Sequence, residues 1–128
     1  MAALLLACTP AVTDGDTFRC GRERIRLLAI DAPELAGHCR RGRRCVSGDP
    51  RRATRSLRQA LTRRPLLIRR AGVDRYGRTL AAVSAGGMDL SCHQLRVRSA
   101  IYVARWDHAG WIARSCYSQA TPSPSRSR

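Results

Sequence analysis

The chain has 128 residues, which is room for one domain with a core of modest size. All of its 24 basic residues are arginine, and against 9 acidic residues they give a formal net charge of +15. Such a field attracts polyanions, and the planar guanidinium group suits bidentate contact with phosphate, so nucleic acid is the first candidate partner. No run of 18 apolar residues occurs, which excludes a membrane span from this pattern.

Four segments of the chain are predicted to form strands. Residues 1–7 are apolar and are interpreted either as the remnant of an export signal or as the lead into the first strand. A tight turn around Gly21 joins the first two strand-like segments into a hairpin. The strand-like segments are residues 12–19, 25–30, 66–69 and 79–83.

Helical signals lie between and after these strands. Asp49-Pro50 is typical of a helix start, and Ala53 and Leu57 begin a helical repeat that Pro65 stops. A second short helix is expected near residues 89–97.

The order of these elements predicts one α+β domain over residues 8–118. Its expected form is a small, five-stranded β-barrel like the oligonucleotide-binding (OB) fold, with two or three helices. Residues 119–128 form a Pro/Ser/Arg tail that is expected to be disordered.

Six cysteines in so short a chain favour disulfides and an exported protein, periplasmic or secreted. Their pairing is left open by the sequence, because six cysteines can combine in many ways. Cys39 with Cys45 is the favoured local pair, since the two flank an arginine-rich loop; Cys8 with Cys20 and Cys92 with Cys116 come next. Zinc is the competing interpretation, but no C-x-x-C occurs.

Carboxylates gather near the ends of the first two strand-like segments. Asp14-Gly15-Asp16-Thr17 lies in the first, and Asp31-Ala32-Pro33-Glu34 follows the second. Hard carboxylate oxygens favour calcium or magnesium over zinc, and an ion with few protein ligands keeps waters that can act as nucleophiles. Glu34 can accept the proton of such a water. Arg26 and the turn 74–78 supply guanidinium groups for the charge that develops on a phosphoryl group.

At these residues the chain resembles the thermonuclease (staphylococcal nuclease-like) family. The resemblance rests on D-G-D-T, then R-L-L-A-I-D-A-P-E over residues 26–34, then D-R-Y-G-R over residues 74–78, and it spans roughly residues 8–106. It implies an OB-type barrel with helices and a bound Ca²⁺. The implied calcium ligands are Asp16, Asp31 and the backbone carbonyl of Ala32.

The resemblance also implies roles for the other motif residues. Glu34 is expected to be the general base or to orient the attacking water, and Arg26 and Arg78 to grip the scissile phosphate. Arg75 and Tyr76 are expected to contact a terminal phosphate of the nucleic acid. Asp14 is expected to support the turn beside the ion.

Four features depart from the family pattern. Ala32 replaces a threonine, and Arg98-Ser99 replaces the glycine that usually ends the second helix. The third helix is expected to be missing or reduced to residues 107–118. The Cys39–Cys45 loop has no counterpart, and it is expected either to order the mouth of the site or to bring arginines to the substrate.

With this resemblance, the sequence is interpreted as a nuclease that hydrolyses DNA and RNA and acts as a monomer, and the resemblance implies that it depends on calcium and leaves 3′-phosphate ends. The alternative is a non-catalytic nucleic-acid-binding module on the same barrel. His38, His93 and His108 fall outside the motifs and are interpreted as surface or packing residues. Trp106 and Trp111 are interpreted as core residues, with base stacking as the alternative.

Overall fold

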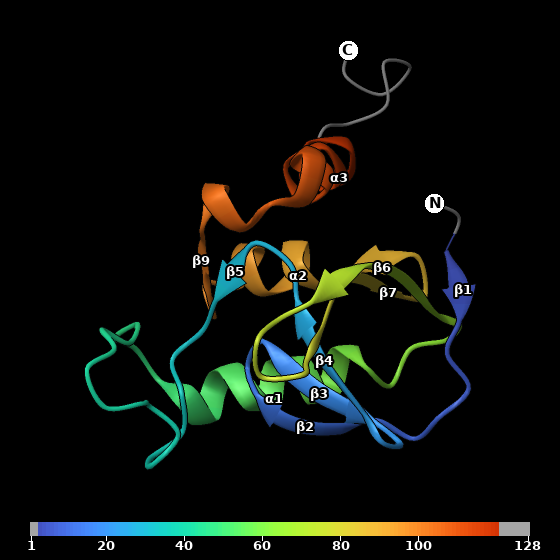
Figure 1. Cartoon of the computed structure of the whole chain (residues 1–128). Helices are drawn as coiled ribbons and strands as arrows, with labels where there is room; N and C mark the ends of the chain where they lie inside the picture. Colours follow the sequence, from blue (N-terminus) through green and yellow to red (C-terminus); the bar gives the residue numbers. More distant parts are fainter. Residues whose placement is uncertain (1–2, 121–128) are drawn as a thin grey trace.

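The structure is a computed structural model that describes residues 3–120 (Figure 1). It is an α+β arrangement of one seven-stranded sheet, one two-stranded sheet and three α-helices. The strands are β1 (Leu4–Leu5), β2 (Ala11–Asp14), β3 (Thr17–Cys20), β4 (Glu23–Leu27), β5 (Ile30–Asp31), β6 (Leu66–Val73), β7 (Thr79–Ala85), β8 (Met88–Asp89) and β9 (Ile101–Tyr102). The helices are α1 (Pro50–Ala60), α2 (Leu90–Arg96) and α3 (Trp111–Ala120), with short 3-10 turns at Ala104–Trp106 and His108–Gly110.

The seven-stranded sheet runs in the order β1-β6-β7-β4-β3-β2, and β8 pairs with β7. Most neighbours are antiparallel, but β4 and β7 are parallel. The expected five-stranded barrel therefore differs from what is observed. Among the described residues the sheet has more strands, and it ends at β1 and β2 instead of closing on itself. The central path still has the mixed pairing of an OB-like, partly open sheet.

Two predicted strands are each broken into two. The 12–19 segment splits into β2 and β3, because the Asp14-Gly15-Asp16 sequence forms the hairpin turn between them. The 25–30 segment breaks at Ala29, whose φ of 66° bends the chain out of the sheet. Ile30 and Asp31 then pair with β9 instead. The turn at Gly21 joins β3 and β4 as predicted.

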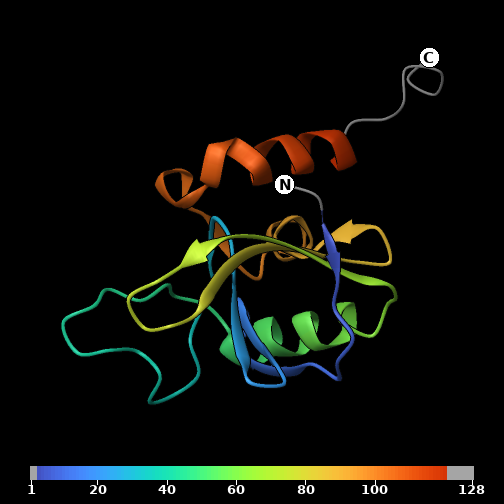
Figure 2. The same ribbon diagram turned by 45° about the vertical axis from the view of Figure 1, so that its right-hand side comes forward.

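Helix α1 confirms its predicted start. The Asp49 carboxylate accepts hydrogen bonds from the backbone N–H groups of Arg51 and Arg52, and Pro50 stands in the first turn. The buried face of the helix includes Ala53 and Leu57. In both views α1 and α3 lie at opposite ends of the molecule with strands between them (Figures 1 and 2).

The main core forms where the buried strand faces meet α1 and α2. Its largest fully buried side chains include Phe18, Ile25, Leu27, Leu57, Leu66, Ile68 and Leu90. A second cluster holds α3 against the sheet through Leu28, Cys92 and Ile112. Leu4 and Leu5 are exposed and extend the sheet beside β6.

Three disulfides cross-link the described residues, and they are the three pairs that the sequence favoured. They join Cys8 to Cys20, Cys39 to Cys45 and Cys92 to Cys116. Such bonds persist in an oxidising or extracellular compartment. No helix in residues 3–120 is long and apolar enough to cross a membrane.

Helix α2 ends without the glycine that the family resemblance implies at this position. Arg98 takes the left-handed conformation itself, with φ of 60°. The N–H of Ser99 bonds the carbonyl of Gln94 at 2.8 Å, and the N–H of Arg98 bonds that of Leu95 at 3.1 Å. These two bonds define a Schellman cap, in which the left-handed position favours glycine. The helix end is therefore normal, but it is formed by an unfavourable residue.

Replacing Arg98 with glycine is expected to stabilise the fold. A residue with an L side chain in the left-handed region costs about 1 kcal/mol or slightly more, and glycine removes this cost. Part of the resulting gain in stability is offset by the extra freedom of glycine in the unfolded chain. We expect Arg98→Gly to raise the unfolding free energy by about 0.5–1 kcal/mol in urea titrations. Arg98→Ala removes the same side chain and keeps the strained φ, so it is expected to show no gain. An equal gain in both variants would contradict this explanation.

Candidate functional site

One face of the sheet carries arginines in a regular register. Arg26 on β4 lies opposite Thr17 on β3 and beside Leu80 on β7. Because side chains alternate along a strand, Arg24 and Arg78 share this face with Arg26, while Ile25 faces the core. Arg78 stands two residues before Leu80, roughly 7 Å along the sheet from the level of Arg26. The parallel pairing of β4 and β7 thus brings two distant arginines to one surface.

This face forms the wall of a cavity of about 740 Å³. Its size lies in the range of ligand sites, roughly 300–1,000 Å³. Eight arginines and three carboxylates line it, so the cavity is strongly cationic. The arginines are Arg19, Arg24, Arg26, Arg40, Arg43, Arg75, Arg78 and Arg105, and the carboxylates are Asp14, Glu34 and Asp74.

Asp16 lies buried at the inner end of this region, with 4% of its surface exposed. Its carboxylate accepts hydrogen bonds from the Thr17 hydroxyl at 2.9 Å and from the Ala32 N–H at 2.8 Å. The Arg26 Nη1 atom lies 3.1 Å from its Oδ2 atom. These contacts join the β2–β3 turn to the segment after β5, which are 16 residues apart in the sequence.

Arg26 lies between the two aspartates that the sequence singled out. It is 7% exposed, and its Nη2 atom lies 3.5 Å from Asp31 Oδ1. The Trp106 ring centroid is 5.3 Å from its guanidinium carbon. Among the described residues no acceptor has hydrogen-bond geometry to its buried Nη1 atom. The site therefore contains a buried donor that a phosphate oxygen can satisfy.

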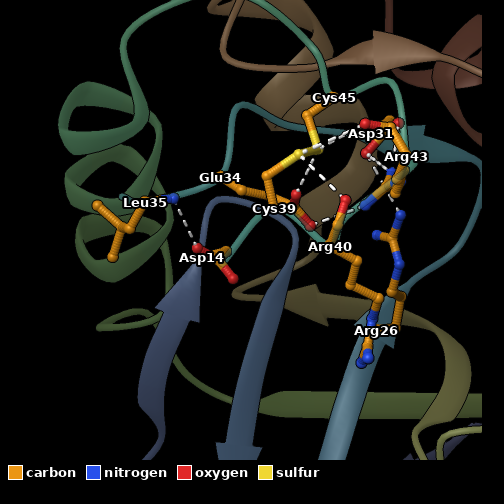
Figure 3. Close-up of a disulfide and its surroundings, with 9 residues drawn as sticks. All are labelled: Asp14, Arg26, Asp31, Glu34, Leu35, Cys39, Arg40, Arg43 and Cys45. Atoms are coloured by element: carbon orange, nitrogen blue, oxygen red, sulfur yellow. Dashed lines mark hydrogen bonds and ion pairs between the residues drawn. A yellow bond between two sulfur atoms is a disulfide. The ribbon is translucent and has the colours of Figure 1, made fainter. Parts of the chain in front are cut away.

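Asp31 and Glu34 are bridged by Arg43, which comes from the Cys39–Cys45 loop (Figure 3). The Arg43 Nη2 atom lies 2.9 Å from both Asp31 oxygens, and its Nη1 atom lies 2.7 Å from Glu34 Oε1. Burial raises the pKa of Glu34 above its ordinary value, and the nearby carboxylates Asp14, Asp16 and Asp31 add to this rise against the opposing effect of Arg43. A carboxyl with a raised pKa is a better proton acceptor than an ordinary glutamate.

Asp14 supports the segment that follows Glu34. Its Oδ1 atom accepts the N–H of Leu35 at 3.1 Å and lies 2.9 Å from His38 Nδ1 (Figure 3 shows the Leu35 bond). The interpretation of His38 as a surface or packing residue thus omitted its contact with a site carboxylate, although its side chain is 41% exposed. His93 contacts Ser56 and His108 contacts the Trp111 ring.

Arg78 lies in the same cavity but is paired with its own turn. Its Nε atom bonds Asp74 Oδ2 at 2.8 Å, and Asp74 Oδ1 accepts the backbone N–H groups of Tyr76 and Arg78. Burial alone would raise the pKa of Asp74, but these hydrogen bonds hold it below its ordinary value. The structure therefore places Arg78 at the cavity, where its ion pair is with Asp74 and not with Asp16 or Asp31, the carboxylates that pair with Arg26.

Tyr76 is the centre of a second group of arginines. The guanidinium carbons of Arg40, Arg75 and Arg78 lie 3.8, 5.1 and 5.5 Å from its ring centroid. Arg24 donates to the Tyr76 carbonyl. Cation–π contacts of this kind hold guanidinium groups over a ring while leaving donors for an anionic ligand.

A divalent cation fits the chemistry of the acidic cluster. Among the described residues Arg26 pairs with Asp16 and Asp31, Arg43 pairs with Asp31 and Glu34, and Asp14 contacts His38, so four carboxylates share two guanidinium partners and one imidazole. Carboxylate oxygens are the donors that calcium prefers. Glu34, Cys39 and Cys45 also have donor atoms within 4.8 Å of one another. The two sulfur atoms are joined in a disulfide, so that group is not a thiolate metal site.

Sequence reasoning missed three residues of this site. Arg43 appeared only as one arginine of the loop, and Trp106 was assigned to the core although it lines the cavity. Gln94 of α2 was not considered. Its fully buried Nε2 atom donates to the carbonyls of Gly15 at 2.7 Å and Ala53 at 2.9 Å, so it ties the Asp-Gly-Asp turn to α1. The sequence feature that could have identified Gln94 is the presence of a glutamine on the buried face of a helix.

Position 15 requires glycine because neighbouring atoms leave no room for a side chain, and not because of its φ angle. A Cβ atom there would lie 2.6 Å from the Cβ of Ala53 and 3.0 Å from that of Ala32. Gly15→Ala is therefore expected to push the turn off α1 and to lower the unfolding free energy by about 1–3 kcal/mol in denaturant titrations. Gly72→Ala is the matched control, because a Cβ there meets nothing within 4 Å. Equal effects of the two substitutions would contradict the packing argument.

One comparison with known proteins identifies the family of the chain. A family model described as staphylococcal nuclease homologue matches residues 24–110. The matched segment contains Arg26, Asp31, Glu34 and Arg78, and the structure brings Asp16 to it from the preceding turn. No curated protein matches the chain. Since the family model covers more than half of the sequence, the chain belongs to the staphylococcal nuclease homologue family.

Proposed function

We propose that the protein is a calcium-dependent nuclease that hydrolyses phosphodiester bonds of DNA and RNA and leaves 3′-phosphate ends. Membership of the family supports a nuclease-like or nucleic-acid-related function in general. The observation that carries the specific proposal is that Arg26 pairs with Asp16 and Asp31 while Arg43 joins Asp31 to Glu34, beside a cavity with eight arginines. A local excess of carboxylate in a chain of charge +15 is what an ion acting on a phosphate requires.

The acidic cluster would hold the ion. Asp16 and Asp31 would supply carboxylate oxygens, and Ala32, fully buried directly after β5, would supply its backbone carbonyl. When bound, Ca²⁺ would lower the pKa of a water and neutralise charge on the phosphate. Glu34 would take the proton of the attacking water, a role that its raised pKa supports. Asp14 would hold the backbone of this segment through Leu35.

The arginines would bind the phosphate from the opposite side. The buried Nη1 atom of Arg26 is ion-paired with Asp16 but makes no contact of hydrogen-bond geometry in the described residues, which supports its contact with the scissile phosphate. Arg78 would supply a second guanidinium for the charge that grows in the transition state. Its pairing with Asp74 keeps it extended along the cavity wall.

The rest of the cavity suits a flexible nucleic acid strand. Arg75 and Tyr76 would contact phosphate or sugar beyond the cleavage point, and the Trp106 ring offers a surface for stacking on a base. Neither contact reads sequence, and we expect little base preference. The three disulfides support an exported protein, and we expect it to act as a monomer.

A binding module without turnover is the second candidate, and one observation favours it. Arg43 covers both oxygens of Asp31 and one of Glu34, which blocks the ligand and the base at the same time. If that contact persists with substrate, the arginine-lined cavity binds nucleic acid and the acidic cluster does no chemistry.

Cleavage of plasmid and of single-stranded RNA with calcium, with magnesium and with chelator separates the candidates. We expect cleavage with calcium and none with chelator. Binding of a labelled oligonucleotide without cleavage under any condition would support the binding module. Cleavage that persists in chelator would reject the calcium-dependent mechanism.

Arg78→Ala is expected to lower kcat by roughly 10²–10³-fold, because one preorganised donor to the transition state is lost. Glu34→Ala is expected to lower kcat at least as much, since the proton acceptor is lost. Arg58→Ala is the matched control for Arg78→Ala, because Arg58 lies exposed on α1 outside the cavity. Unchanged turnover in Arg78→Ala or Glu34→Ala, with the unfolding midpoint preserved, would reject the role assigned to that residue.

A further inference from the structure

Arg43 is the only loop arginine whose guanidinium reaches a carboxylate in the described structure. One guanidinium group covers three of the four oxygens of Asp31 and Glu34, at distances between 2.7 and 2.9 Å. The Arg43 side chain is 31% exposed, whereas the two carboxylates are 10% and 14% exposed. Arg43 thus reaches inward from the surface, and its guanidinium group lies where a metal ion would contact Asp31 and Glu34.

The loop that carries Arg43 is held at both ends. Cys39 and Cys45, six residues apart, close it by a disulfide, and the Cys45 sulfur lies 3.0 Å from Glu34 Oε2. Inside the loop the N–H of Arg43 bonds the carbonyl of Arg40 at 3.1 Å. Arg40 in turn lies over the Tyr76 ring at 3.8 Å, which joins the loop to the β6–β7 turn. A tethered guanidinium has a high effective concentration at the carboxylates.

An ion and this guanidinium compete for the same oxygens. Calcium binds carboxylate oxygens at roughly 2.3–2.6 Å, and the N–H groups of Arg43 already contact both oxygens of Asp31 and one of Glu34, so an ion bound there would lie against a like charge. Without Arg43, Asp31 would keep its ion pair with Arg26 and Glu34 would keep none among the described residues, so these two carboxylates would attract a cation more strongly.

We propose that Arg43 is a tethered internal cation that exchanges with a divalent ion at Asp31 and Glu34. The Cys39–Cys45 disulfide keeps it in place and thereby lowers the affinity of the site for the ion. Ion binding turns Arg43 out toward the cavity and frees Glu34 at the same time. The inference rests on the proposed function, since it takes the acidic cluster as the site of a divalent cation.

Calorimetric titration of the oxidised full chain with calcium tests the exchange. Arg43→Gln is expected to bind calcium about 10-fold to 100-fold more tightly than the wild type, because charge-assisted hydrogen bonds no longer compete. Arg44→Gln removes the same charge from the same loop, and its exposed side chain contacts no carboxylate in the described structure, so it is expected to change the affinity by less than about 2-fold.

The disulfide is tested with the double variant Cys39→Ala and Cys45→Ala, which leaves the other two disulfides intact. This variant is expected to bind calcium more tightly than the wild type, and adding Arg43→Gln to it is expected to give a smaller gain than in the wild-type background. The calcium-induced rise in unfolding temperature gives a second readout, and it should be larger for Arg43→Gln than for Arg44→Gln.

The outcomes separate this inference from the proposed function. Equal or weaker calcium binding by Arg43→Gln, with clear binding by the wild type, would overturn the exchange and leave the calcium site standing. Equal gains in Arg43→Gln and Arg44→Gln would also overturn it, because general charge would explain both. If neither the wild type nor any variant binds calcium, both the calcium site and the exchange are rejected.

Discussion

Everything in this site depends on bringing like charges together. Asp14 ends β2, Asp16 lies in the hairpin turn that follows, Asp31 ends β5 and Glu34 lies in the segment after it, and each is buried or half-buried. Buried carboxylates repel one another, and burial disfavours their charged forms. The fold offsets this with the backbone N–H groups of Ala32 and Leu35 and with two guanidinium groups. Positive charge is therefore a structural requirement of the site as well as an attraction for substrate.

The backbone that holds these charges is fixed by packing and not by the charges themselves. Gln94 bonds the carbonyls of Gly15 and Ala53, and Gly15 lies against α1 where no side chain fits. The parallel pairing of β4 with β7 sets Arg26 and Arg78 on one face. Each of these contacts joins segments far apart in the sequence. The Asp-Gly-Asp turn is consequently held in place by packing against α1 and α2, which is the condition for a preorganised site.

The local features of this protein could be predicted from its sequence better than the long-range ones. Helix α1 follows from Asp49-Pro50 and its apolar spacing, and the β3–β4 hairpin follows from the turn at Gly21. The breaks at Gly15 and Ala29 were missed, because an alternating pattern continues through a turn that the tertiary structure imposes. Arg43 could not be singled out, since four arginines share its loop and only the path of the closed loop decides which one reaches Asp31.

Arginine suits the exchange at this site better than other cations do. A planar guanidinium can bridge two carboxylates at once, whereas an ammonium group acts as a point charge, and Arg43 uses one nitrogen for Asp31 and the other for Glu34. The disulfide-closed loop carries this group on a short tether, so part of the negative charge of Asp31 and Glu34 is balanced without an ion. In the proposed exchange, only this surface loop has to move for the two carboxylates to bind an ion. The same loop carries three further arginines, and Arg40 among them already lines the cavity that the nucleic acid would occupy.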